Sequence, residues 1–248
     1  MKIFFGIDGC HAGWIVVSCD SDLCFKSCWV KSIQETIDYI RGATLTLIDI
    51  PIGLKDGKQP GNFGRRACDV KAREILGKRA FSVFPAPQRE ALKAETWEEA
   101  NSINKKICGR GLSKQTGGIM KKIAGVDFIL ISDMSLQSRL RETHPEVCFW
   151  SLNNRQIMKH PKKPEQGLDE RLGVLARLSQ NANEFYKRIR SQHKVKDVRS
   201  DDIVDAMAAA LTASLSDRYG IQTLPQTPEI DSHGLRMEIV FTNFEELE

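Results

Sequence analysis

Four aspartates at the ends of predicted elements are the residues of this chain best suited to chemistry. Asp8 and Asp49 each stand at the end of a short apolar, strand-like run, and Asp202 and Asp205 lie in the first two turns of an apolar helical pattern. A buried carboxylate without a partner is costly in free energy, so such an acid pairs with a base, caps a turn or binds a cation. The four come from three distant parts of the chain, so only a fold that brings those parts together makes them a site.

Converging carboxylates repel one another unless cations screen them, and hard divalent ions such as Mg²⁺ or Mn²⁺ take oxygen ligands. Two such ions, about 3.5–4 Å apart, activate a water and stabilise the leaving oxygen in phosphodiester hydrolysis. We expect Asp8, Asp49 and Asp205 to be metal ligands and catalytic residues, with Asp202 as a further catalytic acid. The alternative for any one acid is that it caps a turn or pairs with an arginine, but the three acids together favour the metal site.

A second acidic group lies in the segment Leu136–Trp150, which we expect to form a fifth strand. Regular alternation along that strand would place Glu142, His144 and Glu146 on one face. Glu142 is then a candidate catalytic residue, Glu146 a candidate metal ligand and His144 a candidate substrate contact. Pro145 indicates an edge strand or a bulge. The alternative is a loop held by Arg65 or Arg66.

The middle of the chain is basic. Between Lys55 and Lys122 there are 16 Lys and Arg against 7 Asp and Glu, whereas the net charge of the whole chain is only +4. Such a segment is either a solvated helical surface or a face that contacts phosphates, and the sequence leaves both open. The candidate substrate-binding residues in it are Arg65, Arg66, Arg73, Arg79, Arg89 and Gln115.

The elements that must position these residues begin with three strand-like runs separated by short turns, which predict an antiparallel meander over residues 2–30. Ser32 and Glu35 form a capping-box pattern that predicts a helix ending near Gly42. The apolar run that reaches Asp49 is the fourth strand. Pro51 then ends that strand.

Residues 55–135 predict a mostly helical insertion after the fourth strand, with helices over 65–77, Thr96–Cys108 and Ser113–Ile123. Further helices are expected over Gly167–Ala182 and after Ser200, which is a good N-cap residue. The tail from Pro225 is expected to be loop with one short strand at 237–241. The predicted organisation is a single α/β domain over residues 1–248.

The composition supports a globular protein: 41% of the 248 residues are hydrophobic, and no run of eighteen apolar residues predicts a membrane span. The N-terminus reaches Asp8 too early for the apolar stretch of a signal peptide, so we expect a cytoplasmic location. The seven cysteines are odd in number and contain no C-x-x-C pair, which favours isolated thiols over a zinc site.

Six segments of the sequence resemble the signature blocks of domain-of-unknown-function family 429. They are GIDGCHAGW, IDIPIGL, ARE-LGKRAFSVFPAP, LSKQ, ETHPEVCFW and DDIVDAMAAA. The resemblance covers most of residues 3–215 and implies a predicted nuclease of the ribonuclease H-like superfamily, with a mixed five-stranded sheet flanked by helices. It matches Asp8 and Asp49 to the acids of the first and fourth strands, and Asp202 and Asp205 to those of the last helix. That helix also resembles the terminal acidic helix of Holliday-junction resolvases.

Our leading hypothesis is a metal-dependent nuclease that hydrolyses phosphodiester bonds in nucleic acid by a two-metal mechanism with Mg²⁺ or Mn²⁺. One alternative is a nucleotide-binding phosphotransferase or hydrolase on a related core, although the chain has one such core and no G-x-x-x-x-G-K-[ST] motif. Another is a non-catalytic nucleic-acid-binding module. The expected partner is nucleic acid of unspecified type, and the oligomeric state is open, with a homodimer among the alternatives.

Overall fold

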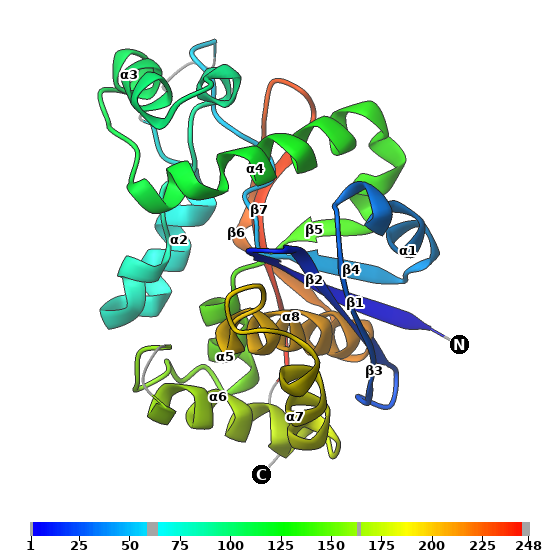
Figure 1. The fold of residues 1–248 in the computed structure, drawn as a ribbon. Coiled ribbons are helices and arrows are strands. Elements are labelled where there is room, and N and C mark those ends of the chain that lie inside the picture. The colour runs from blue at the N-terminus through cyan, green and yellow to red at the C-terminus, as the bar shows by residue number, and fades with distance from the viewer. Residues whose placement is uncertain (1, 59–63, 163–164, 245–248) are drawn as a thin grey trace. The chain divides into compact units, whose positions relative to one another are not determined.

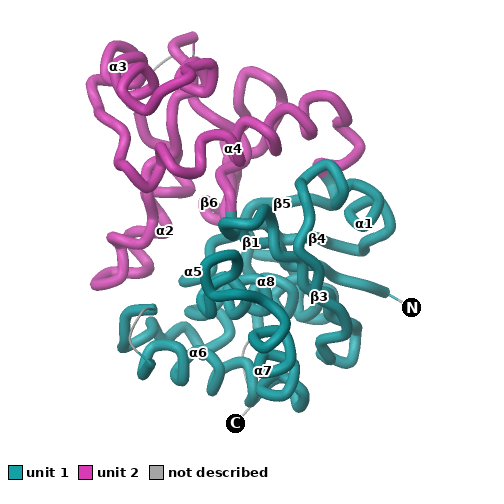
Figure 2. Tube along the Cα trace, viewed as in Figure 1, with its two compact units in different colours: residues 1–49, 138–222, 240–248 teal, residues 50–137, 223–239 magenta. Residues whose placement is uncertain are grey.

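The structure is a computed structural model in which residues 2–58, 64–162 and 165–244 are described. The chain divides into two compact units, each made of segments that are separated in the sequence (Figure 2). Unit 1 contains residues 1–49, 138–222 and 240–248, and unit 2 contains residues 50–137 and 223–239. The first boundary falls directly after Asp49, the acid at the end of the fourth strand.

Unit 1 contains a five-stranded mixed sheet in the order β3-β2-β1-β4-β5 (Figure 1). The first three strands form the expected antiparallel meander, while β4 runs parallel to β1 and β5 runs parallel to β4. The prediction of a mixed five-stranded sheet is therefore confirmed. The strands are β1 (Ile3–Cys10), β2 (Gly13–Asp20), β3 (Phe25–Lys31), β4 (Leu45–Ile48) and β5 (Leu140–Glu142).

Helix α8 (Ser200–Tyr219) packs on one face of this sheet, against β1, β2 and β4. The two backbones approach closely at Gly6 in β1, where an added Cβ would lie 2.1 Å from the Ala206 carbonyl oxygen and 2.2 Å from the Ala210 backbone nitrogen. A glycine on the strand and alanines on the helix therefore let the two backbones meet. The buried apolar character of the helix after its first turn is confirmed.

Three further helices pack against α8, as Figure 1 shows: α5 (Pro145–Leu152), α6 (Glu165–Leu178) and α7 (Ala182–Gln192). The other face of the sheet carries an aromatic cluster of Phe5, Trp29 and Tyr39, the last of which belongs to α1 (Ile37–Gly42). The Ser32–Glu35 capping box is present, because the Ser32 backbone N–H donates to Glu35 at 2.8 Å. It precedes a short 3₁₀ turn, Gln34–Thr36, rather than the α-helix itself.

Unit 2 contains the expected helical insertion. Its helices are α2 (Ala67–Leu76), α3 (Trp97–Cys108) and α4 (Lys114–Ser132). Two 3₁₀ segments, Gly77–Ser82 and Arg89–Lys93, lie between α2 and α3. Thr96 and Ser113 each accept a hydrogen bond from a backbone N–H of the first turn that follows, as their N-cap positions predict. Residues 59–63, which precede α2, lie outside the described residues.

Three sequence predictions of local structure were wrong. The fifth strand ends at Glu142, because Pro145 occupies the first position of α5 and His144 is its N-cap. The N-cap of α8 is Arg199 rather than Ser200. The tail from Pro225 is not loop but part of strand β6 (Ile221–Ile230), which pairs with β7 (Arg236–Thr242).

Helix α7 lies beyond the helix predicted to end at Ala182, and the sequence analysis did not anticipate it. The short strand expected at 237–241 lies inside β7. No helix within the described residues is both long and apolar enough to cross a membrane.

The contact between Gly6 and α8 generates a test. In the Gly6→Ala variant the new methyl group meets backbone atoms that cannot rotate away, so we expect the free energy of unfolding to fall by about 3 kcal/mol, the upper end for overpacking. Chemical denaturation measures it. The control is Gly173→Ala in α6, where nothing lies within 4 Å of an added Cβ and stability is expected to rise by up to about 1 kcal/mol. A Gly6→Ala protein as stable as the wild type would contradict the tight contact.

Candidate functional site

Asp8 and Asp49 occupy neighbouring positions on adjacent parallel strands. Ile7 pairs with Ile48 in the register of β1 and β4, and the Asp49 backbone N–H continues the ladder by donating to the Ile7 carbonyl at 2.9 Å. Side chains alternate along a strand, so Asp8 shares the face of Gly6, the residue that meets α8. The two aspartates therefore lie side by side, Asp8 near the end of β1 and Asp49 directly after β4, on the face that α8 covers.

Helix α8 brings Asp202 and Asp205 to the same place. Asp202 lies in the first turn and accepts the Arg199 backbone N–H at 2.8 Å, which completes the N-terminal cap. Asp205 follows one turn later and is only 5% exposed. Its Oδ1 atom is buried and has no hydrogen-bond partner among the described residues. Such an orphaned carboxylate oxygen is uncommon in a folded protein and calls for an explanation.

The remaining oxygen of Asp205 is paired with a lysine that sequence analysis missed. Lys162 donates from Nζ to Asp205 Oδ2 at 2.5 Å, and its side chain is 24% exposed. It lies in the segment between α5 and α6, where nothing in the local pattern separates it from a solvated surface lysine. Its partner is 43 residues away in the sequence, so only the tertiary fold could have identified it.

The electrostatics show that these groups form one cluster. Burial is the largest cause of the raised pKa of Asp8. The carboxylates that raise it further are those of Asp49, Asp205 and Asp202. Burial also raises the pKa of Asp205 to about 7, against the opposing effect of Lys162. For Lys162, burial lowers the pKa but the surrounding carboxylates, Asp205 first, outweigh it, so its pKa is raised.

Glu146 belongs to the edge of this cluster, because it contributes to the raised pKa values of both Asp205 and Lys162. It lies in the first turn of α5, and its Oε1 accepts from Arg171 of α6 at 2.5 Å in a fully buried ion pair. Arg171 also donates to the His160 and Gly167 carbonyls. This arginine therefore ties Glu146 to the segment that carries Lys162.

Glu142 and His144 do not join the four aspartates in the way the sequence predicted. Glu142 pairs with Ile48 in the sheet register, one position before Asp49, so the pleat directs its side chain to the opposite face. His144 accepts the Glu146 backbone N–H through Nδ1 at 3.2 Å, which is the role of a helix cap. The expectation that Glu142, His144 and Glu146 share one strand face was wrong, because α5 begins at Pro145.

The candidate substrate-binding residues of the basic segment all belong to unit 2, and several are engaged in its own structure. Arg66 pairs with Asp69 and donates to the Ile52 carbonyl at 3.0 Å. Arg73 donates to two backbone carbonyls, Ala80 and Val83.

Arg89 pairs with both Asp127 and Asp231, and Arg79 is buried beside the ring of Phe81. These arginines hold unit 2 together. Arg65 and Gln115, in contrast, are exposed.

Two features of the cluster favour the binding of a hard cation, and one does not. Its ligands would be carboxylate oxygens only, and Asp205 Oδ1 is an acceptor without a hydrogen-bond partner in the part of the chain that the structure describes. However, no group of three or more His, Cys, Asp or Glu side chains in the described part of the chain is arranged to hold a metal ion. The cation of the cluster, as the structure has it, is the Lys162 ammonium. A metal ion bound to the same carboxylates would compete with this ammonium.

The Glu146–Arg171 pair generates a prediction about stability. Removing one partner of a buried ion pair leaves an uncompensated charge, so Arg171→Met should lower the free energy of unfolding by about 3–5 kcal/mol. The double variant Glu146→Gln/Arg171→Met should lose clearly less than Arg171→Met alone. Denaturant unfolding of the two single variants and the double variant completes the cycle. Losses that simply add would show that the two side chains are not coupled.

Asp202 generates a prediction about pH. Burial is the main reason that its pKa rises from 3.8 to about 6, so its contribution to stability is fully present below pH 3.8 and is lost as pH rises through 6. Asp202→Asn keeps the oxygen that caps the helix but removes the charge. In metal-free buffer the free energy of unfolding of the variant should exceed that of the wild type increasingly between pH 4 and 7. The difference should reach about 1–2 kcal/mol, because solvent screens part of the interaction. Thermal melts across this range measure the difference, and a difference independent of pH would contradict it.

Comparison with known proteins places the chain in a family. No curated protein and no solved structure matches it. The family described as "Protein of unknown function (DUF429)" matches residues 6–230, a range that contains all four aspartates, Lys162 and the Glu146–Arg171 pair. This match confirms the family to which the sequence blocks pointed. The chain therefore belongs to the DUF429 family of proteins of unknown function.

Proposed function

We propose that this protein is a metal-dependent phosphodiesterase that cleaves nucleic acid, with its active site at the carboxylate cluster of unit 1. The observation that carries the proposal is the gathering of four aspartates from three separate elements. Asp8 comes from β1, Asp49 follows β4, and Asp202 and Asp205 come from α8. Burial raises the pKa of Asp8, Asp202 and Asp205, and a group of carboxylates with raised pKa values is typical of functional sites rather than of scaffolds.

The fold supports the same function. A meander of three strands, a helix, a fourth strand parallel to the first and a final helix across the sheet is the arrangement that the sequence resemblance implied for a ribonuclease H-like core. We extend the family assignment to that superfamily as part of this proposal. Since one fold supports many activities, the argument for the activity rests on the site and not on the fold.

The roles of the chain's residues follow from their positions. Asp8, Asp49 and Asp205 are the residues that would hold Mg²⁺ or Mn²⁺, and such an ion supplies Lewis acidity and an activated water when bound. Asp205 Oδ1, which has no hydrogen-bond partner among the described residues, is available for this purpose. When no metal ion is bound, Lys162 offsets part of the negative charge of the cluster, and its ammonium lies beside the site, where it could contact a phosphate oxygen of the substrate. Arg171 keeps the Lys162 segment and Glu146 in place.

A nuclease assay tests the proposal. With Mg²⁺ or Mn²⁺, we expect cleavage of at least one substrate among single-stranded DNA and RNA, duplex, RNA–DNA hybrid and branched DNA. Chelation with EDTA should abolish the activity. Asp49→Asn should weaken Mn²⁺ binding, measured by calorimetry, on the order of 10- to 100-fold or more. Lys162→Gln should tighten Mn²⁺ binding, because it removes the competing cation.

The matched control is Asp217→Asn, an aspartate in the last turns of the same helix that pairs with Lys2 on the surface. It should leave metal binding and cleavage unchanged. The proposal is overturned if no substrate is cut and Asp49→Asn binds Mn²⁺ as the wild type does. Binding of nucleotides without cleavage would instead indicate a phosphotransferase on a related core, and steeply salt-dependent binding of nucleic acid without turnover would indicate a binding module.

A further inference from the structure

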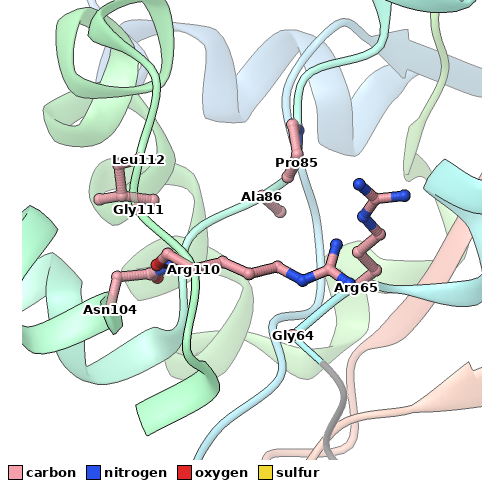
Figure 3. Close-up of a pocket in the computed structure, with 8 residues that line it drawn as sticks. All are labelled: Gly64, Arg65, Pro85, Ala86, Asn104, Arg110, Gly111 and Leu112. Carbon is pink, nitrogen blue, oxygen red and sulfur yellow. Dashed lines mark hydrogen bonds between the residues drawn. The ribbon is translucent and has the colours of Figure 1, made fainter. Parts of the chain in front are cut away.

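Unit 2 contains a pocket of about 430 Å³ into which two arginines extend from different segments (Figure 3). Arg65 precedes α2, and Arg110 follows α3, with its side chain reaching across the pocket towards Arg65 in Figure 3. Pro85 and Leu112 contribute apolar surface to the wall. A pocket of this volume suits a small ligand.

The segment that carries Arg110 is fixed by two asparagines of α3. Asn104 is buried, and its side-chain amide donates to the Arg110 carbonyl at 2.8 Å while its oxygen accepts the Gln88 backbone N–H at 2.7 Å. Asn101 accepts the Leu112 backbone N–H at 2.8 Å. The backbone of Arg110 and of Leu112, two residues later, is thus anchored to the helix.

Glycines pack closely against neighbouring groups on this segment and beside Arg65. An added Cβ at Gly111 would lie 2.8 Å from Asn101 Oδ1, and one at Gly64 would lie 2.8 Å from Cys108. Gly64 also has a φ of +74°, a left-handed conformation that favours glycine. Both arginines therefore project from backbone whose course is set by close packing.

Arg65 and Arg110 differ from the other arginines considered in unit 2. Arg66, Arg73 and Arg89 are each held by carboxylates or carbonyls. Within the described part of the chain, the Arg65 and Arg110 guanidinium groups have no ion pair or hydrogen bond, and both side chains are exposed. Two unneutralised guanidinium groups in one pocket repel each other, and a dianion between them would remove that repulsion.

We propose that this pocket binds the phosphate monoester group of a ligand through Arg65 and Arg110. Guanidinium groups match phosphate oxygens with paired, charge-assisted hydrogen bonds, and two of them balance the two charges of a phosphate monoester. The apolar wall at Pro85 and Leu112 accommodates the organic part. The phosphate is either that of a free nucleotide-sized molecule or the terminal phosphate of an oligonucleotide. The site is distinct from the carboxylate cluster, and the proposal does not depend on nuclease activity.

Calorimetry in EDTA tests the pocket without involving metal. The probes are inorganic phosphate, AMP, a 5′-phosphorylated trinucleotide and the same trinucleotide without the phosphate. We expect AMP or the phosphorylated trinucleotide to bind and the unphosphorylated one to bind at least 10-fold more weakly. Binding of AMP identifies a free nucleotide-sized ligand as sufficient, whereas binding of the phosphorylated trinucleotide alone identifies an oligonucleotide end.

Arg65→Gln and Arg110→Gln should each weaken binding of the phosphorylated probe about 10- to 100-fold. Both side chains are exposed, so thermal melts should show folded variants. Arg236→Gln, an exposed arginine of the same unit that does not line the pocket, is the matched control and should bind as the wild type does. The proposal is overturned if no phosphorylated probe binds at millimolar concentration, or if both pocket variants bind as tightly as the control.

Discussion

The arrangement of unit 1 depends on one close contact between backbones, that of α8 with β1 at Gly6. The strand has no side chain there and the helix presents Ala206 and Ala210, so the helix axis lies nearer to the sheet than larger residues would allow. Asp205, the residue directly before Ala206, is buried and lies close enough to Asp8 of β1 to raise its pKa. The close packing of α8 on β1 thus brings the aspartates of the helix next to those of the strands.

That closeness has an electrostatic consequence which the surrounding residues offset. Asp49, Asp205 and Asp202 raise the pKa of Asp8, Asp49 also raises that of Asp205, and Lys162 supplies the opposing positive charge. Arg171 holds the segment of Lys162 through the His160 carbonyl and neutralises Glu146 at the same time. A single buried arginine therefore links the charge balance of the cluster to the packing of α5 and α6.

Much of this could be predicted from the sequence, for identifiable physical reasons. The spacing of apolar residues predicts β1, β4 and α8. The sequence alone also shows an acid near the end of each of these strands and acids in the first turns of the helix. Glu142 and Glu146 could not be placed, because Pro145 is compatible with either a strand edge or the first turn of a helix. Lys162 and Arg171 could not be found at all, since their partners are distant in sequence and their own neighbourhoods resemble ordinary surface.

The long segment of sequence between β4 and β5 has a consequence for how the chain folds. β4 and β5 are hydrogen-bonded neighbours, yet about ninety residues separate Ile48 from Leu140. The entropy lost in closing such a loop grows only with the logarithm of its length, by about 0.6 kcal/mol for each doubling. Large changes in the length of the inserted segment should therefore change the free energy of unfolding only slightly. They should have a larger effect on the rate at which β4 and β5 pair during folding.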